Sequence, residues 1–409
     1  FTAWFTGQTI NDAFEVSEIM THPDNSIDGG DWIEILNITN TEINLGNYEI
    51  ADSNYFHNFE LPFNTRILPN ERIIICSDTV LFNNVYPSVQ NVYGPLGYNL
   101  SNSVETLFFK DQDGNPIKTI TYSAEIPWPL GVDGTGSSLE FMGGPLSQND
   151  PDAWFAGCVG GSPGEAYFVC DSFIVVNEIN YSSSTASNAG DWFEIKSFSS
   201  GAVDLSDWVI TDENGLVTYT IPTGTILQPD SIIVFVRDLT LFQTVHPEVL
   251  NIVGPTAIAL GGSDVIRLYD NNGILQVSVA YSNAIAWPQE PNGGGTTLEL
   301  ISASEIMNSP LNWFSGCPNG SPGVNYIFGC GVGVDELENQ LFSIAPNPGT
   351  DDIKLISNIG GEIQFMDLNG QIVFTMDKLN EIATINVSNL NPGMYFVRLN
   401  NMVKQFVKL

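Results

Sequence analysis

The chain has 409 residues, of which 12 are Lys or Arg and 47 are Asp or Glu, so its formal charge at pH 7 is −35. A surface that binds phosphates needs clustered cations, and this composition therefore excludes nucleic acid and anionic membrane surfaces as favourable partners. The 43% hydrophobic and 11% aromatic contents are typical of a folded chain, and no apolar run reaches the ~18 residues of a membrane-spanning helix.

The apolar residues follow short strand patterns with turns between them. Ile33 and Ile35 alternate with Trp32 and Glu34, which predicts a strand with the isoleucines towards a core and the other pair on the opposite face. Apolar runs predict buried strands at 73–76 and 232–236, and Asp, Asn and Gly predict hairpin turns at 111–114 and 270–273. With Gly and Pro gathered between the runs, the pattern is typical of an all-β chain.

Sliding the chain against itself reveals an internal repeat. A shift of 160 residues places Asp31-Trp32-Ile33-Glu34-Ile35 on Asp191-Trp192-Phe193-Glu194-Ile195 and Glu18 on Glu178. After a slip of one residue, Gly161-Ser162-Pro163-Gly164 falls on Gly320-Ser321-Pro322-Gly323. A register held over this length predicts two copies of one domain, and their many short strands favour tandem immunoglobulin-like β-sandwiches.

These repeated residues resemble a known family. The order E-I, then D-W-x-E-I, then W-F-x-G-C and G-S-P-G is similar to the lamin-tail domain in both copies, over residues 14–170 and 171–330. The resemblance implies an immunoglobulin-like sandwich that serves as a non-catalytic module in secreted bacterial proteins. Both copies are longer than the minimal domain, so the role of their C-terminal halves is an open question.

Residues 1–13 form a separate N-terminal segment. Ala3-Trp4-Phe5-Thr6-Gly7 resembles Ala153-Trp154-Phe155-Ala156-Gly157, the closing motif of the first copy, either because an upstream repeat ends there or by coincidence. Phe1 to Gln8 lack the basic and apolar parts of an intact signal peptide, so we expect a mature form or a fragment.

The composition changes after Cys330, where a linker over 331–340 leads into a denser strand pattern over 341–409. We expect a small C-terminal β-sandwich with a hairpin at Asp367-Leu368-Asn369-Gly370, because Asn-Gly favours a tight turn. This region is similar to the type A C-terminal sorting domain of the type IX secretion system. The residues that match this domain are Pro346, Asn347, Pro348, Asp367, Asn369, Gly370, Gly393, Tyr395, Lys404 and Lys408. One residue departs from its pattern, because Gln405 stands where a second Lys is usual.

The second resemblance implies a route and a destination. The type IX machinery exports the chain across the outer membrane, a sortase-like peptidase removes the sorting domain, and the product is released or attached to lipopolysaccharide at the cell surface. Because the periplasm is oxidising, we expect Cys158 to bridge Cys170 and Cys317 to bridge Cys330. Cys76 lies in an apolar strand and is interpreted as a small buried hydrophobe.

Two triplets suggest modification. Asp78-Thr79-Val80 and Asp230-Ser231-Ile232 resemble the D-[ST]-aliphatic acceptor of O-glycosylation in bacteria with this secretion system, which would place sugars on Thr79 and Ser231. Such triplets also arise by chance, so the alternative is that neither residue is modified.

The sequence offers little catalytic material, and we predict no catalytic residue. Gly160-Gly161-Ser162-Pro163-Gly164 fits the G-x-S-x-G pattern of hydrolases, but no parallel β-α-β pattern surrounds it, so we interpret it as a structural turn. The three histidines, His22, His57 and His246, share no position between the copies, and no phosphate-loop or dinucleotide motif occurs.

Acidic residues recur at matching positions of the two copies. Glu18 can meet Glu34 if their strands are neighbours, and the recurring acids are Glu18, Asp31 and Glu34 with Glu178, Asp191 and Glu194. One hypothesis is a Ca²⁺ site, since this cation favours carboxylate oxygens. The alternative is that these acids cap turns, accept backbone N–H bonds or stay solvated. Trp32 and Trp192 either stack on sugars or cover the sheet, and we favour covering.

The sequence therefore predicts an exported, non-catalytic binding or adhesion protein whose ligand is a surface, a protein or a glycan. We expect no nucleic-acid partner and no cofactor other than the Ca²⁺ considered above. Two alternatives stay open at this point: the accessory region of a larger secreted hydrolase or nuclease, and a structural spacer at the cell surface.

Overall fold

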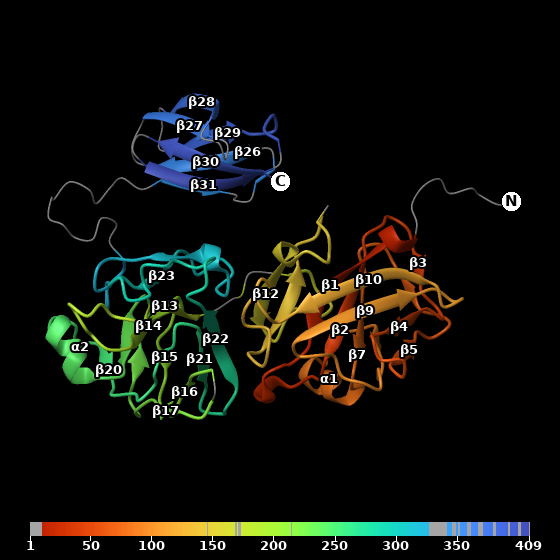
Figure 1. Cartoon of the computed structure of the whole chain (residues 1–409), viewed down its shortest axis with the longest axis horizontal. Helices are drawn as coiled ribbons and strands as arrows, with labels where there is room; N and C mark the ends of the chain where they lie inside the picture. Colours follow the sequence, from red (N-terminus) through yellow and green to blue (C-terminus); the bar gives the residue numbers. More distant parts are fainter. Residues whose placement is uncertain are drawn as a thin grey trace. The chain divides into compact units, whose positions relative to one another are not determined.

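The computed structural model describes residues 10–144, 146–167, 170, 173–213, 215–326, 342–345, 349–350, 352–357, 361–366, 371–378, 382–391, 393–399 and 402–408. Contacts divide the chain into two compact units, residues 1–330 and 331–409 (Figure 1). Strands dominate both units, so the all-β prediction is confirmed. Within the described ranges, no helix has the length and apolar character needed to cross a membrane.

In the first repeat, a six-stranded sheet and a four-stranded sheet enclose a common core. The larger sheet has the order β12 (Trp154–Val159), β11 (Ser137–Phe141), β1 (Phe14–Met20), β2 (Trp32–Asn37), β7 (Arg72–Cys76) and β8 (Val92–Tyr93). The smaller sheet has the order β10 (Pro116–Ser123), β9 (Val104–Lys110), β4 (Glu49–Ala51) and β5 (Asn58–Glu60). β3 (Ile43–Asn44) pairs with β6 (Arg66–Ile67), and single turns of 3₁₀ helix occur at Ile10–Asp12, Asn25–Ile27 and Pro151–Ala153.

The second repeat has the same architecture. Its larger sheet has the order β20 (Ile252–Val253), β19 (Ile232–Val236), β14 (Trp192–Ser197), β13 (Ile174–Asn180), β23 (Leu298–Leu300) and β24 (Trp313–Ser315). The smaller sheet has the order β17 (Thr218–Thr220), β16 (Val209–Thr211), β21 (Asp264–Tyr269) and β22 (Leu275–Tyr281). β15 (Val203–Asp204) pairs with β18 (Ile226–Leu227), and a 3₁₀ turn occurs at Pro310–Asn312.

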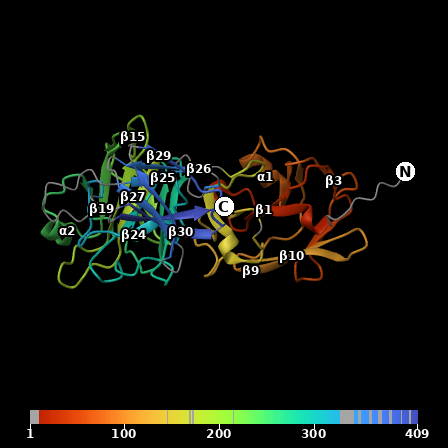
Figure 2. The ribbon, with the colours of Figure 1, turned by 90° about the horizontal axis from the view of Figure 1, so that it is seen from above.

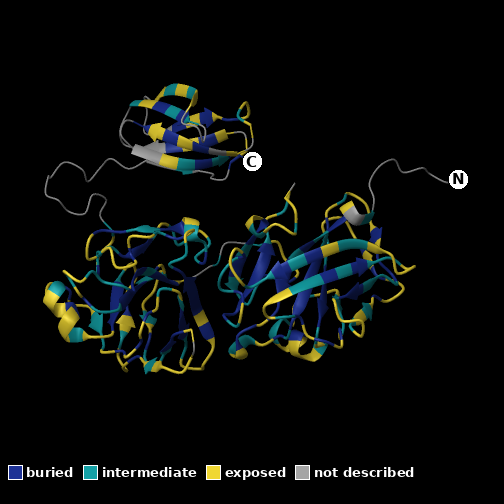
Figure 3. Cartoon of the chain, viewed as in Figure 1, coloured by how far each residue is buried: buried dark blue, intermediate teal, exposed yellow. Residues whose placement is uncertain are grey.

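The alternation in β2 places its side chains as the sequence predicts, but both faces are buried. Ile33 and Ile35 lie in the core between the sheets, while Trp32 and Glu34 on the opposite face are also shielded from solvent. Figure 3 shows this burial along the strands, with exposed residues at loops and hairpin ends. The predicted strands at 73–76 and 232–236 are β7 and β19, and the predicted turns join β9 to β10 and β21 to β22.

A short helix covers the outer face of each larger sheet, and the sequence analysis did not predict it. α1 (Thr79–Val85) joins the parallel strands β7 and β8, and α2 (Leu239–Val245) joins β19 and β20. Phe82 of α1 meets Trp32 edge to face at 6.0 Å between ring centroids, and Phe242 of α2 meets Trp192 at 5.7 Å. Figure 2 shows α1 and the β9–β10 pair on opposite sides of the first repeat. Trp32 and Trp192 therefore cover the sheet, as favoured, and have no free face for a sugar.

Among the described residues of the first unit, two hydrogen bonds join the repeats. The Tyr269 hydroxyl donates to Asp24 Oδ2 at 2.7 Å, and Leu275 N–H donates to Ser26 Oγ at 2.9 Å. Leu130 of the first repeat packs against the core of the second. The repeats thus share a mixed polar and apolar contact.

The C-terminal unit is a separate small sandwich. One sheet has the order β25 (Phe342–Ala345), β26 (Asp352–Ser357) and β29 (Ile382–Asn386), and the other has the order β28 (Ile372–Lys378), β27 (Gly361–Met366), β30 (Gly393–Leu399) and β31 (Met402–Lys408). Their alternating apolar residues form one core around Phe365 and Phe406. The segment Ala3–Gly7 lies outside the described residues, so its resemblance to Ala153–Gly157 is not settled.

Candidate functional site

Three glutamates meet on the outer face of the larger sheet in each repeat. In the first repeat, Glu18 of β1 lies directly opposite Glu34 of β2 on one side and Glu140 of β11 on the other. Directly paired residues of antiparallel strands project from the same face, so the three carboxyl groups gather there. All three side chains are buried. We call Glu18, Glu34 and Glu140 the first carboxyl cluster, and Glu178, Glu194 and Glu299 the second.

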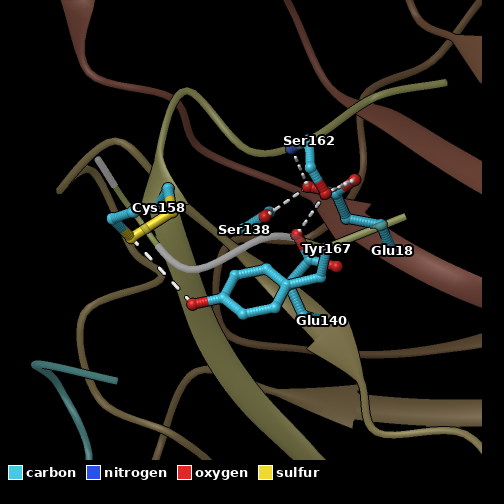
Figure 4. Close-up of a disulfide and its surroundings, with 7 residues drawn as sticks. Glu18, Ser138, Glu140, Cys158, Ser162 and Tyr167 are labelled. Carbon is cyan, nitrogen blue, oxygen red and sulfur yellow. Dashed lines mark hydrogen bonds between the residues drawn. A yellow bond between two sulfur atoms is a disulfide. The ribbon is translucent and has the colours of Figure 1, made fainter. Parts of the chain in front are cut away.

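The first carboxyl cluster holds the G-S-P-G turn that closes the repeat (Figure 4). Ser162 N–H donates to Glu18 Oε1 at 2.9 Å, and the Ser162 hydroxyl donates to Glu140 Oε1 at 2.8 Å. Gly164 N–H donates to Glu34 Oε2 at 2.7 Å. Because each glutamate binds the turn by at least one hydrogen bond, the cluster ties three strands to a segment more than 120 residues away from β1 and β2.

The second carboxyl cluster repeats these contacts. Ser321 N–H donates to Glu178 Oε1 at 2.9 Å, its hydroxyl donates to Glu299 Oε1 at 2.8 Å, and Gly323 N–H donates to Glu194 Oε2 at 2.8 Å. Two residues before Glu140 and Glu299, the hydroxyl groups of Ser138 and Thr297 donate to Glu18 and Glu178, each at 2.5 Å. The arrangement is therefore a property of the repeat.

Burial in a low-dielectric site favours the neutral form of these acids. Desolvation, followed by the charges of the neighbouring glutamates, raises the pKa of Glu18 and Glu178 well above the usual 4.5. Desolvation raises the pKa of Glu34 to about 7 and that of Glu194 to about 8. The neighbouring carboxyl group of Glu140 raises the pKa of Glu18 further, because two like charges side by side oppose each other's ionisation. Each cluster is therefore a structural site whose carboxyl groups resist ionisation.

The first glycine of each closing turn cannot be replaced without a clash. Gly161 and Gly320 have φ of +67° and +82°, in the left-handed region that favours glycine. A Cβ at either residue would collide with Oε1 of Glu18 or Glu178. The G-x-S-x-G match is thus a structural turn, as interpreted, because the Ser162 hydroxyl donates to a buried carboxyl group.

A disulfide lies next to the closing turn. Cys158 and Cys170 are bonded with Cα atoms 5.4 Å apart, which confirms the first predicted bridge. Tyr167, inside the loop that this bridge closes, packs edge to face on Phe155 of β12 at 4.6 Å between ring centroids. Cys317 is also disulfide-bonded, and its predicted partner Cys330 lies outside the described residues. Cys76 is a buried free thiol, in agreement with its interpretation as a small hydrophobe.

The residues proposed for Ca²⁺ are not brought together as a set. Glu18 and Glu34 do meet, and so do Glu178 and Glu194, but their oxygens accept hydrogen bonds from the closing turns. Asp31 instead accepts from Leu100 N–H at 2.7 Å, and Asp191 binds Arg237 Nη1 at 2.8 Å. Among the described residues, no group of three or more His, Cys, Asp or Glu side chains is arranged to hold a metal ion. These acids accept N–H hydrogen bonds, which was the alternative to a Ca²⁺ site.

The remaining predicted residues lie on the surface or in the C-terminal unit. Thr79 begins α1, beside the capping residue Asp78, and the Ser231 hydroxyl donates to Gln228 O at 2.8 Å. Strand pairing in the sorting region places Gly393 opposite Lys408 and Val397 opposite Lys404, and the Tyr395 hydroxyl donates to Asn391 O at 2.8 Å. Pro346, Asn347, Pro348, Asp367, Asn369 and Gly370 lie outside the described residues. Glycosylation and the sorting role of individual residues stay predictions.

Sequence reasoning missed three parts of the site. Glu140 and Glu299 complete the clusters, and Arg72 binds Glu34 Oε1 through Nε at 2.9 Å. The signal for the two glutamates was present, because Leu139-Glu140 aligns with Leu298-Glu299 in the repeat. No comparable signal marks Arg72, since Ile232 occupies its place in the second copy.

These features define a class: tandem immunoglobulin-like sandwiches, each closed by a buried carboxyl cluster. The lamin tail domain family matches residues 11–124 and 172–283, which is more than half of the chain, and the chain belongs to this family. The matched ranges end before the last two strands of each larger sheet, which are β11 and β12 in the first repeat and β23 and β24 in the second, and before the closing turns. The additional C-terminal halves of the repeats therefore supply Glu140, Glu299 and the turns that the clusters hold.

The secretion system C-terminal sorting domain matches residues 343–409. It directs export by the type IX secretion system to the cell surface or the extracellular space, and it implies contact with that machinery. Both recognised domain types are non-catalytic.

Solved structures with low similarity were also found. A DUF4876 family protein from Bacteroides thetaiotaomicron is 10% identical, with 71% of this chain and 95% of that chain covered and a TM-score of 0.23. A biofilm-associated protein, described as its BSP domain, is 11% identical, with 97% of this chain and 81% of that chain covered and a TM-score of 0.16. No curated protein matches the chain.

Proposed function

We propose that this exported chain is a non-catalytic binding or adhesion protein, in which two rigid sandwiches present their loops and sheet ends to a ligand outside the cell. The observation that carries this proposal is the fate of the recurring carboxyl groups. Carboxyl groups are the most abundant reactive groups of the sequence, and the glutamates that recur in the two repeats lie in the interior, bound to the closing turns. A buried, hydrogen-bonded carboxyl group stabilises a scaffold and has no access to substrate.

The tail gives the proposal its location. After export, a sortase-like peptidase would remove residues 341–409, and the two sandwiches would be released or joined to lipopolysaccharide. The strong negative charge keeps such a product soluble and repels polyanionic partners.

The first experiment is the intact mass of the native protein in cell-surface and medium fractions. We expect a species lighter than the full chain by the mass of residues 341–409, with a ladder of heavier species if lipopolysaccharide is attached. A predominant species that retains the tail would contradict the sorting step. A much larger species would favour the accessory region of a secreted enzyme over a self-contained binding protein.

A second experiment separates a binding protein from a spacer. Deletion of the gene should make the cells that normally produce the protein adhere less to their natural surfaces. Purified full chain, added in excess, should compete with wild-type cells for attachment. A spacer would leave adhesion unchanged in the competition, because it makes no contact of its own with the surface.

A further inference from the structure

Exposed apolar side chains gather at one end of the smaller sheet in the first repeat. Ala51, the last residue of β4, pairs with Phe108 of β9, and Ser123, the last residue of β10, pairs with Val104. The β4–β5 turn and the segment after β10 therefore emerge at the same end, beside the start of β9. Tyr55 and Phe56 in the turn are 92% and 87% exposed, and Ile126 after β10 is 57% exposed.

The second repeat has the same feature at the matching places. Its β16–β17 turn and the segment after β22 also emerge together, since Thr211 pairs with Arg267 and Tyr281 with Asp264. Leu216 matches Phe56 and is 87% exposed, and Ile285 matches Ile126 and is 94% exposed. We call Tyr55, Phe56 and Ile126 the first apolar tip, and Leu216 and Ile285 the second. Scattered exposed apolar residues are common, but their recurrence at the same end of both copies calls for an explanation.

The first tip is held rigid by its own turn. Asp52 Oδ2 lies 2.6 Å from His57 Nδ1, and Asp52 Oδ1 accepts from Asn54 N–H at 2.6 Å. The His57 ring stacks on Tyr98 with centroids 4.5 Å apart and an interplanar angle of 4°. Because the turn is fixed before any partner arrives, Tyr55 and Phe56 can be buried by a partner without the entropy cost of ordering a loop.

The difference in residue type between the two tips restricts the chemical class of the partner. An aromatic pair in the first tip becomes aliphatic in the second, so sugar stacking, which needs a ring face, is not the property they share. The shapes also differ, and a protein pocket shaped for Phe56 next to Tyr55 would not fit Leu216 next to Gly215. The retained property is apolar character on a projecting loop. A fluid lipid interface accepts apolar side chains of any shape.

The negative charge of the protein restricts the kind of lipid headgroup that it can bind. Asp52 and Glu105 lie at the first tip, Glu213 and Asp264 lie at the second, and the whole chain carries a charge of −35. Anionic headgroups would repel these acids, whereas neutral headgroups would not.

We propose that the apolar tips insert into the interface of a neutral, zwitterionic lipid surface and so give the exported protein a second means of attachment. This inference rests on the proposed binding function and names one surface for it. Tyr55 and Phe56 would enter the headgroup–acyl boundary, as interfacial aromatic residues do, and Leu216 and Ile285 would add a second contact.

The test is sedimentation of the full chain with phosphatidylcholine vesicles at physiological salt. We expect binding to these vesicles, weaker binding when phosphatidylserine is added, and a loss of about tenfold in partitioning for Phe56→Ser, in line with the removal of one buried large apolar side chain. Leu216→Ser should lower binding further in the same chain. Because these side chains are exposed, the variants should melt like the wild type.

Two control variants make the result specific. Phe56→Leu keeps the apolar character and should retain most of the binding. Phe63 follows β5, so it lies at the opposite end of the same sheet, and it is 74% exposed. Phe63→Ser should therefore leave binding unchanged. Equal losses for Phe63→Ser and Phe56→Ser would show non-specific adsorption and overturn the inference.

Failure of this inference is distinguishable from failure of the proposed function. A wild-type chain that stays in the supernatant with every vesicle overturns lipid insertion, while competition for cell adhesion would still support a binding protein with another ligand. Binding that is abolished by Phe56→Leu would also overturn it, because a shape-specific partner would then be required.

Discussion

The two carboxyl clusters differ in their cation, although they hold identical turns. In the first repeat, Arg72 of β7 reaches Glu34 at 2.9 Å and lies opposite Leu36. In the second repeat, the apolar and basic positions of this strand pair are exchanged, so that Ile232 lies opposite Lys196. Lys196 turns away to Asn325 at 2.7 Å and Asp230 at 3.1 Å, and Asn177 donates to Glu194 instead.

This comparison shows that the ion pair is not what makes the cluster. The hydrogen bonds from the closing turn and the neighbouring hydroxyl are the same in both repeats, with and without a cation on the glutamate. The cation instead adjusts protonation. Desolvation raises the pKa of Glu34 to about 7 and that of Glu194 to about 8, and the charge of Arg72 or Lys196 lowers the pKa of the glutamate near it.

The largest expected effect follows from removing the shared element. Glu18→Ala or Glu178→Ala should lower the unfolding free energy of its own repeat by about 3–5 kcal/mol, because a buried cavity forms and the serine N–H of the closing turn loses its acceptor. Urea denaturation with hydrogen exchange resolved by repeat would measure the loss. Glu18→Gln, which fills the space, should cost less. Similar stability of the alanine variant and the wild type would rule out a structural role.

Opening the disulfide should have the next largest effect. Cys158→Ser with Cys170→Ser should destabilise the first repeat by about 2–4 kcal/mol, since the bond closes the loop beside the turn. The same urea experiment would report it, with Cys76→Ser as a control for the loss of a thiol. Alkylation of the native chain should leave Cys158 and Cys170 unmodified, and labelling of either residue would contradict the bridge.

The pH dependence should separate the repeats. The folded pKa values of the clustered acids lie above the ordinary value of 4.5, so their contribution is complete below about pH 4.5 and is lost as pH rises through the folded values. For Glu34 the loss should end near pH 7 and amount to about 3 kcal/mol, and for Glu194 it should end near pH 8 and amount to about 5 kcal/mol. Carboxyl titration by NMR would measure both, and Glu34→Gln should remove its own part. Ordinary titration near pH 4.5 would refute the raised pKa values of the clustered acids.

Exchanging the residue at position 72 or 232 should shift the pKa of the neighbouring glutamate. Arg72→Ile copies the second repeat and should raise the pKa of Glu34 above about 7 while destabilising the first repeat by about 1–2 kcal/mol at pH 8 and less at pH 5. The difference between the two pH values is the diagnostic measurement, since a pure packing loss would be equal at both. Ile232→Arg in the second repeat should lower the pKa of Glu194.

Calcium should have the smallest effect. Because the carboxyl oxygens of both clusters accept protein hydrogen bonds, we expect the same melting temperature in excess Ca²⁺ and in EDTA. Calorimetry of the full chain would check this, with Mg²⁺ as the comparison ion. A rise in melting temperature with Ca²⁺ alone would reopen the metal hypothesis.

Part of the site was predictable because duplication repeats it. The recurrence of Glu18 and Glu34 with the closing G-S-P-G turn marked these residues before any coordinates, and period-two alternation placed both glutamates on one face. α1 was not predictable from periodicity, because seven residues are too few to establish a helical pattern. The exposure of the tip residues Tyr55 and Phe56 was not predictable either, because an apolar residue in a turn is normally expected to be buried against the rest of the chain.

The sequence by itself determined the repeat, the all-β class, the sorting tail and the first disulfide, since each depends on local pattern or on residues repeated in the same order. Only the tertiary structure decided that Glu140 completes the cluster of Glu18, because the two residues are 122 positions apart and strand pairing between distant segments leaves no local trace. Burial then raised the pKa of six acidic residues, which a sequence presents as charges, and made them hydrogen-bonding groups that close the two domains.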